Sequence, residues 1–224
     1  MTEEVVGEIS TKKVGSRVMT PMQPMVVKRY IPDPGSKVVA LTFDDGPWPG
    51  TTEQVLDILA EHDIKATFFV VGNLVERYPD LVRRTVDEGH TIANHTYSHK
   101  ILTRHNGETI RDEIVRGSKA IQDVTGITPR WFRPPGGAMN DKVVSEAARV
   151  NMELVMWDAD PMDWRRYGAQ PMLNLLLKAI GPGSVVLLHD GGGDRAQTVE
   201  LLPQLIQELK DRDYTFVTLD ELAR

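Results

Sequence analysis

Two adjacent carboxylates, Asp44 and Asp45, directly follow the apolar run 38–41 (VVAL), which has the pattern of a buried strand. Neighbouring side chains on a continuing strand point to opposite faces, so both aspartates can act on one substrate only if the strand ends and the backbone turns. The next two residues, Gly46 and Pro47, supply a turn. If a divalent metal ion lies at this strand end, one carboxylate can be its ligand while the other stays free as a base for an activated water.

A second group of potential metal ligands lies further along the chain, in the sequence HTYSH at 95–99. If these residues form one helical turn, His95 and His99 can both reach a single ion at about 2.0 to 2.1 Å. The chain has no cysteine, so any metal must be held by histidine and carboxylate. Two histidines and one carboxylate leave coordination positions open, as a catalytic site requires. The structural alternative is one histidine satisfied in the core and the other exposed.

Segments with strand and helix patterns alternate along the chain from about residue 37 onward. Seven such units predict an α/β fold, with a parallel sheet inside and helices outside, and their number favours a closed or nearly closed barrel over an open sheet. The predicted strands span 38–43, 65–71, 91–93, 131–133, 153–157, 184–188 and 214–217. The predicted helices span 51–61, 78–88, 108–124, 141–150, 170–180 and 196–211.

The side chains able to do chemistry fall at the carboxyl ends of these predicted strands, which is where parallel barrels build active sites. They are Asp44, Asp45, His95, Arg133, the acidic segment 158–163, His189 and Asp190. The glycine-rich segment 190–194 lacks the spacing of a phosphate loop or a calcium loop, so we expect a flexible rim loop there. His62, His90 and His105 lie away from this rim and are expected to be structural or exposed.

Residues 1–36 show no periodicity and contain several Pro and Gly turns, so we expect an N-terminal arm or linker followed by a catalytic domain over 37–224. Acidic residues outnumber basic ones, 32 to 26, which argues against a nucleic-acid partner. No apolar run is long enough to span a membrane. The first residues are acidic, unlike a signal peptide, so the protein is either cytosolic or an exported protein whose leader was removed.

Five short motifs, TFDDGP, HTYSH, RPPGG, DPMDW and LLH, occur in the order and approximate spacing of the motifs of the polysaccharide deacetylases, carbohydrate esterase family four, which this chain resembles over residues 42–189. The resemblance implies a distorted (β/α)7 barrel and a divalent metal, usually zinc, with cobalt or another divalent ion as alternatives. It also implies hydrolytic removal of acetyl groups from N-acetylglucosamine polymers such as peptidoglycan or chitin oligosaccharides. Family members that act on wall polymers work outside the membrane, so an extracellular or cell-envelope location is expected, without excluding the cytoplasm.

The resemblance also implies a role for each motif residue. The catalytic residues are Asp44 as base, Arg133 as the group that positions it, His189 as general acid and Asp163 as the carboxylate that tunes His189. The metal ligands are Asp45, His95 and His99. The substrate-binding residues are Gly136, whose N–H holds the oxyanion, and Trp164 and Leu187, which line the acetyl pocket.

One departure from the family pattern puts substrate preference in doubt, because Gly136 stands where many members have an aromatic residue and a pocket wall is lost. Two rival functions stay open: an acetylxylan O-deacetylase using the same site, and a glycan-binding module that has lost turnover. The sequence also leaves open whether Trp48 contacts sugar, whether Trp164 is plain core packing, and whether Asp158 and Asp160 support the ligands. Protein partners cannot be inferred.

Overall fold

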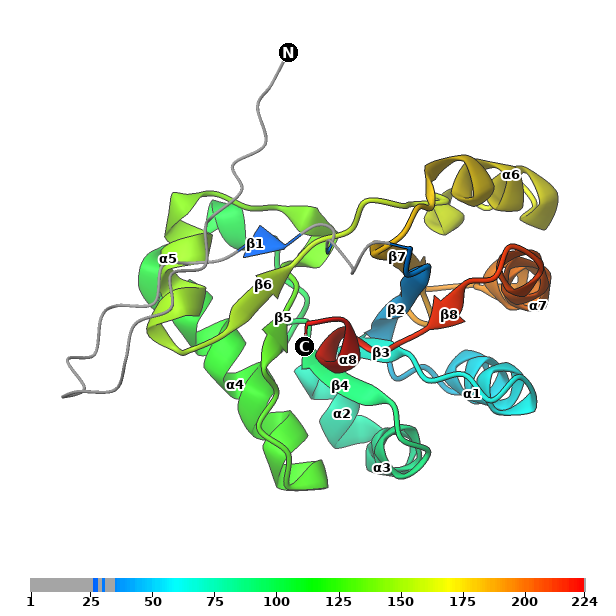
Figure 1. Ribbon diagram of the computed structural model, residues 1–224. Helices are drawn as coiled ribbons and strands as arrows, with labels where there is room; N and C mark the ends of the chain where they lie inside the picture. Colours follow the sequence, from blue (N-terminus) through cyan, green and yellow to red (C-terminus); the bar gives the residue numbers. More distant parts are fainter. Residues whose placement is uncertain (1–25, 28–29, 31–34, 224) are drawn as a thin grey trace, which may run out of the picture.

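The strands that the structure describes all run parallel in one sheet that curls into a half-barrel, with helices around its outside (Figure 1). The computed structural model describes residues 26–27, 30 and 35–223. The strand order is β1-β6-β5-β4-β3-β2-β7, and β8 pairs with β2 beside this path. The strands are β1 Val26–Val27, β2 Val38–Gly46, β3 Thr67–Val70, β4 Thr91–Asn94, β5 Trp131–Phe132, β6 Glu153–Val155, β7 Ser184–His189 and β8 Thr215–Phe216. The predicted α/β architecture, a distorted barrel of parallel strands, is confirmed.

The gap between β6 and β7 is bridged by residues that follow β6. The Leu187 N–H donates to the Ala159 carbonyl at 2.9 Å, and the Asp158 N–H donates to the Val185 carbonyl at 3.2 Å. The Asp158 carboxylate also accepts hydrogen bonds from the Ser184 hydroxyl and the Val185 N–H, each at 2.8 Å. Asp158, whose role the sequence left open, therefore ties the two edges of the barrel together.

Strand β1 lies inside the segment 1–36 that was expected to be an arm. It pairs with Leu154 and Val155 of β6, and it covers a strand edge whose backbone groups would otherwise lack partners. Residues 1–25, 28–29 and 31–34 of that segment lie outside the described part of the chain. The arm and the domain boundary at residue 37 therefore stay predictions.

Strand β8 pairs with Val38 and Val39 at the start of β2, and not with β7, the strand before it. β7 already occupies one edge of β2 from Val39 onward, while β3 pairs with the other edge only from Thr42 onward. The start of β2 thus has an unpaired edge, which β8 fills.

The helices follow the predicted periodicity, with two additions. The predicted helix 78–88 is preceded by a separate short helix, and a capping box between Thr218 and Glu221 starts one more turn after β8. The helices are α1 Thr51–Glu61, α2 Gly72–Arg77, α3 Pro79–Asp87, α4 Gly107–Thr125, α5 Asp141–Arg149, α6 Ala169–Ala179, α7 Ala196–Asp211 and α8 Leu219–Leu222. Among the described residues, none of the helices has the length and apolarity needed to cross a bilayer.

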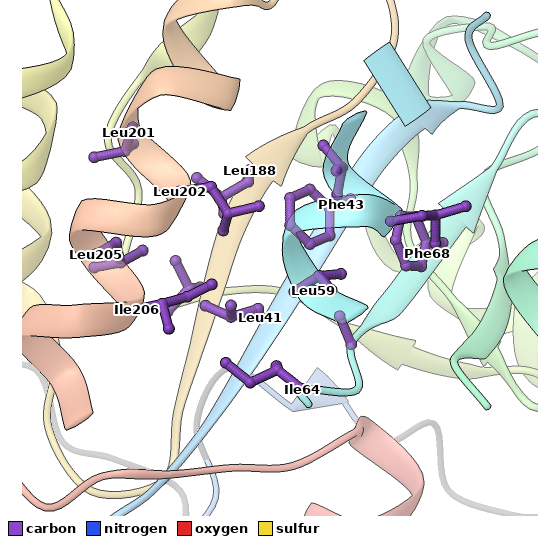
Figure 2. Packing of buried hydrophobic residues seen from close by; sticks show 14 of the residues in the cluster. Leu41, Phe43, Leu59, Ile64, Phe68, Leu188, Leu201, Leu202, Leu205 and Ile206 are labelled. Atoms are coloured by element: carbon purple, nitrogen blue, oxygen red, sulfur yellow. The ribbon is translucent and has the colours of Figure 1, made fainter. Parts of the chain in front are cut away.

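In the largest hydrophobic cluster, β2 and β7 pack against α1 and α7 (Figure 2). Helix α7 places its buried residues at helical spacing, which directs them to one face; they are Leu201, Leu202, Leu205, Ile206 and Leu209. They face Leu41 and Phe43 of β2, both fully buried. Each such side chain contributes roughly 1.5 to 3 kcal/mol by burial. The strand that carries the paired aspartates is therefore held firmly by the core.

Helix α8 closes the end of the barrel where the strands begin, and it lies across the centre of the sheet in Figure 1. Leu219 is fully buried in the cluster inside the barrel, and its N–H donates to the Thr67 hydroxyl at 3.1 Å. The Asp220 carboxylate accepts hydrogen bonds from Trp131 Nε1 at 2.8 Å and from the Thr91 hydroxyl at 3.0 Å. Thr67 and Thr91 begin β3 and β4. Helix α8 therefore acts as a plug at this end of the barrel, and only the carboxyl ends of the strands are free for a site.

Candidate active site

A bulge in β2 brings both aspartates to the same rim. The pairing of β2 with β3 is regular up to Asp44 and then skips one residue, so that Gly46 pairs with Val70 and Asp45 is left out of the ladder. Asp45 has a φ of 75°, so its side chain does not follow the alternation of a regular strand. The prediction that the strand stops after residue 43 is wrong, because β2 continues to Gly46. The extra residue, and not the end of the strand, allows Asp44 and Asp45 to work side by side.

The segment that carries the two histidines is an irregular turn, so the expected helical turn at 95–99 is wrong. Thr96 and His99 have φ values of 70° and 56°, outside the helical region. The turn is held by its own side chains: the His99 N–H donates to the Thr96 hydroxyl at 3.0 Å, and the Thr96 N–H donates to the Asn94 amide oxygen at 2.7 Å. The turn nevertheless places both imidazoles toward Asp45.

Asp45, His95 and His99 form a cluster in which one atom of each can ligate a single ion, since these three atoms lie within 4.8 Å of one another. Asp45 Oδ1 is 2.9 Å from His99 Nε2 and 3.4 Å from His95 Nε2. Burial alone would raise the pKa of Asp45, but the hydrogen bonds from the two histidines outweigh it and hold that pKa well below its usual range. Asp45 is therefore an anion at neutral pH, as a metal ligand must be.

The orientation of His95 favours metal binding. His95 Nδ1 lies 2.8 Å from the carbonyl oxygen of Arg133. A carbonyl can only accept a hydrogen bond, so Nδ1 carries the proton and Nε2 presents its lone pair to the cluster. One carboxylate oxygen and two imidazole nitrogens match the donor set of a catalytic zinc site with open positions. The residues present fit a divalent ion.

Glu113, which the sequence analysis missed, anchors the histidine turn from helix α4. It is fully buried, and its carboxylate accepts hydrogen bonds from the Ser98 N–H at 2.8 Å, the Ser98 hydroxyl at 2.7 Å and Lys100 Nζ at 2.8 Å. These two residues flank His99. Only the fold, and no local motif, brings this glutamate to the turn.

We expect Glu113→Gln to weaken zinc binding about tenfold or more, because loss of a supporting hydrogen-bond acceptor lets the ligand turn relax. Zinc affinity is measured by competition with a fluorescent chelator. Glu108→Gln, on the same helix but exposed, is the control and should bind zinc like the wild type. Equal zinc affinity in all three proteins would contradict the anchoring role.

Asp44 is paired with a fully buried charge, that of Arg133. Arg133 is fully buried, and its Nη1 donates to Asp44 Oδ1 at 2.7 Å and to the Thr42 hydroxyl at 2.9 Å. Its Nε and Nη2 donate to the carbonyls of Val155, the last residue of β6, and Met156, at 3.1 and 3.2 Å. The second Asp44 oxygen, Oδ2, lies 3.8 Å from His95 Nε2. The guanidinium thus fixes one oxygen of Asp44 and leaves the other facing the metal cluster.

His189 and Asp163 form a second pair, in which a carboxylate supports a histidine. His189 Nδ1 lies 2.6 Å from Asp163 Oδ1, and Asp163 Oδ2 accepts hydrogen bonds from the His189 N–H at 2.9 Å and the Thr198 hydroxyl at 2.8 Å. Burial alone would lower the pKa of His189, but the hydrogen bond and charge of Asp163 raise it to about 9. Asp163 thus favours a protonated His189, as a general acid requires.

Of the residues expected to bind substrate, Leu187 and Trp164 lie close in the chain to His189 and Asp163. Leu187 is buried on β7, two residues before His189. Trp164 is 51% exposed in the short helical turn Asp163–Arg165, so the reading of this residue as core packing is wrong. Gly136 has a φ of 62°, and a side chain there would meet only Ile101 Cδ1, at 3.5 Å. The wall that an aromatic residue would form is therefore open.

The segment after β7, expected to be a flexible rim loop, begins with two buried residues, Asp190 and Gly191. Asp190 is 1% exposed, and its Oδ2 accepts a hydrogen bond from the Thr52 hydroxyl at 2.6 Å. Burial raises the pKa of Asp190 to about 7, against the effect of that hydrogen bond. A side chain on Gly191 would lie 2.1 Å from the Asp45 carbonyl oxygen. Gly191 and Gly192 thus allow close packing against the Asp45 bulge, whereas a side chain on Gly193 would meet nothing within 4 Å.

The other residues whose roles the sequence left undecided make local contacts. The Asp160 carboxylate accepts a hydrogen bond from the Met162 N–H at 2.6 Å, so it shapes its own loop. His90 is buried, as expected for a structural residue, and its Nδ1 accepts a hydrogen bond from the Ala66 N–H at 3.1 Å. Trp48 is 37% exposed and lines a cavity together with Asp45 and His99 of the metal cluster.

Comparison with known proteins finds a matching family model and several named relatives. A family model described as "Polysaccharide deacetylase" matches residues 32–155. A peptidoglycan-N-acetylglucosamine deacetylase of Bacillus cereus is 43% identical over 190 residues, which cover 84% of this chain and 89% of that protein. A chitooligosaccharide deacetylase of Bradyrhizobium sp. is 40% identical over 200 residues, covering 84% of this chain and 91% of that protein.

A solved structure of a protein named as a pseudoenzyme is also similar to this chain. A protein of Bacillus anthracis described as a CE4 family pseudoenzyme matches with a TM-score of 0.83 and 31% identity, covering 91% of this chain and 70% of that one. The fold is therefore shared with proteins named as deacetylases and with one named as a pseudoenzyme. Which of these the chain resembles in activity depends on its own site residues.

Proposed function

This chain belongs to the polysaccharide deacetylase family, hydrolases that act on amide bonds, and from that premise we propose that it removes acetyl groups from N-acetylglucosamine units of a glycan such as peptidoglycan or a chitin oligosaccharide. We propose that one divalent ion, zinc, is held by Asp45, His95 and His99. The observation that carries the proposal is the pairing of opposite charge states on the two sides of this cluster. Arg133 stabilises an anionic Asp44, and Asp163 stabilises a protonated His189.

The proposed mechanism assigns one proton transfer to each pair. Asp44, with Oδ1 fixed by Arg133, accepts a proton from the attacking water through Oδ2. The Gly136 N–H is proposed to hold the oxyanion that forms on the acetyl carbonyl. His189 then donates its proton to the departing amine, which cannot leave as an anion. When bound, a divalent ion supplies Lewis-acid polarisation and lowers the pKa of a water.

A non-catalytic glycan-binding module is the rival from another class, and the pseudoenzyme relative makes it concrete. Binding a sugar does not require a base and an acid with opposite charge states. In this chain Asp44 has its guanidinium partner and His189 has its carboxylate partner. These two pairs support turnover over mere binding.

The test is acetate release from chitin oligosaccharides, peptidoglycan and acetylxylan in parallel, with chelator-stripped protein resupplied with zinc or cobalt. We expect metal-dependent release from an N-acetylated glycan. Release from acetylxylan alone would replace the proposal by an O-deacetylase with the same site. Absence of release from all three substrates, with zinc demonstrably bound, would favour the binding module.

The pH dependence of kcat/KM tests the general acid. His189 acts when protonated, so activity should persist on the acid side of its raised pKa and fall as the pH rises through it, about 9 in the metal-free protein. Asp163→Asn removes the carboxylate that raises this pKa, so the alkaline limb should move down by about two pH units. A bound cation lowers the pKa in both proteins, so the shift between them is the measured quantity. Asp160→Asn, which leaves the His189 pair intact, is the control, and an unmoved limb in Asp163→Asn would exclude His189 as the acid.

We also propose that the protein acts outside the cell membrane or within the cell envelope, as the domain 37–224 carried by the segment 1–36. The support is chemical, since the proposed polymers are wall components. Fractionation of the source cells, with the protein followed by antibody, tests this. Recovery only from the cytosol would overturn it.

A further inference from the structure

Three consecutive glycines, Gly191–Gly193, form a glycine segment whose first two residues pack against the proposed metal ligand Asp45. A Cβ atom on Gly192 would lie 2.5 Å from Asp45 Oδ2 and 3.3 Å from Arg195 Nη2. The other oxygen of Asp45, Oδ1, faces His99 Nε2 at 2.9 Å. The Asp45 carboxylate is therefore bounded by the histidines at one oxygen and by the backbone of Gly192 at the other.

The glycine segment needs contacts that hold it in place, because glycine loses more conformational freedom on folding than any other residue. Just before the segment, the Asp190 N–H donates to the Asp44 carbonyl at 3.1 Å. Just after it, Arg195 returns to the segment: its Nε donates to the Gly191 carbonyl at 2.8 Å, and its Nη2 donates to the Gly192 carbonyl at 3.5 Å. Arg195 thus binds the two glycines that contact the proposed metal ligand.

Arg195, the residue directly before α7, is a buried charge whose hydrogen bonds go to carbonyl groups. It is 7% exposed, and it forms no ion pair among the residues that the structure describes. The neighbouring Asp194 carboxylate pairs with Arg166 instead, at 3.4 Å. Burying a guanidinium without a counter-charge is unfavourable, and hydrogen bonds to carbonyls offset part of that cost. The position therefore favours a role for these hydrogen bonds, since an apolar side chain would fill the same space without the cost.

We propose that Arg195 is a positioning residue of the metal site: its hydrogen bonds to the glycine segment hold the backbone of Gly192 against Asp45 and so fix the orientation of the ligating carboxylate. The inference rests on the proposed function, and it deepens the part that concerns the metal. Arg195 is not itself a ligand, because a guanidinium is always protonated and has no lone pair to offer. Its effect passes through the glycine backbone, so loss of Arg195 leaves Asp45 free to turn away from His95 and His99.

The test measures zinc affinity in Arg195→Met, which keeps an unbranched side chain but loses every hydrogen-bond donor. We expect the Kd for zinc, measured by competition with a fluorescent chelator, to rise about tenfold or more, as when a metal ligand loses its support. Arg195→Gln, too short to reach both carbonyls, should show a similar loss and decides the test if Arg195→Met does not fold. Thr198→Val is the matched control and should bind zinc like the wild type. Thr198 is also buried at the start of α7, but its hydroxyl donates to Asp163 and not to the glycine segment.

Cobalt provides a second readout, which a loss of stability alone would not change. Bound Co²⁺ absorbs visible light with an intensity that depends on its coordination geometry, so a displaced Asp45 should alter the spectrum of cobalt-loaded Arg195→Met. Thr198→Val should give the wild-type spectrum. Wild-type affinity and spectrum in the Arg195 variants, or an equal loss in Thr198→Val, would overturn the proposal.

Neither measurement needs a substrate, which separates this inference from the proposed function. If the wild type binds zinc but releases no acetate, the proposed function fails, while the zinc affinities still decide the role of Arg195. If acetate release is confirmed but the Arg195 variants bind zinc like the wild type, only the positioning role is wrong. If the wild type binds no zinc, the metal site and this inference are both wrong.

Discussion

Asp44→Asn is expected to lower kcat by about 10²- to 10⁴-fold while zinc stays bound. Asparagine has the shape of aspartate but no basic oxygen, so the attacking water loses its proton acceptor. The metal cluster consists of Asp45, His95 and His99 and does not include Asp44. Acetate release from chitotetraose and zinc content of the purified variant are the two measurements. Loss of zinc from this variant would mean that the roles of the two aspartates are exchanged.

The same substitution is expected to lower the free energy of unfolding by about 3 kcal/mol, since it leaves a buried guanidinium without its counter-charge. Arg133 is fully buried, and Asp44 is the carboxylate with which it forms an ion pair. Urea denaturation of the zinc-free proteins measures this. Asp194→Asn, which breaks the exposed pair with Arg166, is the control and should cost at most about 1 kcal/mol.

Asp45→Asn is expected to abolish metal binding and with it all turnover. Asp45 is the anion of the cluster, and without it two neutral imidazoles must hold a divalent cation. Chelator-stripped wild type should regain activity with zinc, whereas the stripped variant should not. Zinc at 100 times its Kd adds about 2.7 kcal/mol to wild-type stability, a rise in Tm of roughly 5 to 10 °C. The variant should show no such rise.

His105→Ala is the matched control for metal loss, because His105 is a histidine outside the cluster, after a short turn that precedes α4. Its activity, zinc content and zinc-dependent rise in Tm should equal those of the wild type. If Asp45→Asn regained activity with excess zinc, the cluster would not be the metal site.

Periodicity predicted most of the fold because each of the long helices and buried strands carries its own pattern. Helix α7 is an example, since its leucines repeat at helical spacing. Helix α2 was missed because its six residues are too few to show a period. The pairing of β8 with β2 was missed for another reason, since register between strands far apart in the sequence depends on which edges remain free.

The motifs predicted which residues gather at the site, and the structure brings Asp45, His95 and His99 together as expected. The backbone that does so was not predictable. The β2 bulge depends on pairing with β3, and the histidine turn depends on Glu113, fifteen residues beyond Ser98 in the chain. Arg133 and Asp44, which form an ion pair, are 89 residues apart in the sequence. Long-range contacts of this kind have no local sequence signature.

The plug formed by α8 has a consequence for how the protein is made. Leu219 completes the cluster inside the barrel, and Asp220 binds side chains of β4 and β5. During synthesis these residues leave the ribosome after all of the strands that they join. The nascent chain therefore exposes an unfinished barrel until α8 emerges, and the barrel is completed only after this helix has been translated. Ribosomes arrested before residue 219 should carry chains that proteases still cleave, while those arrested well beyond it should carry resistant ones.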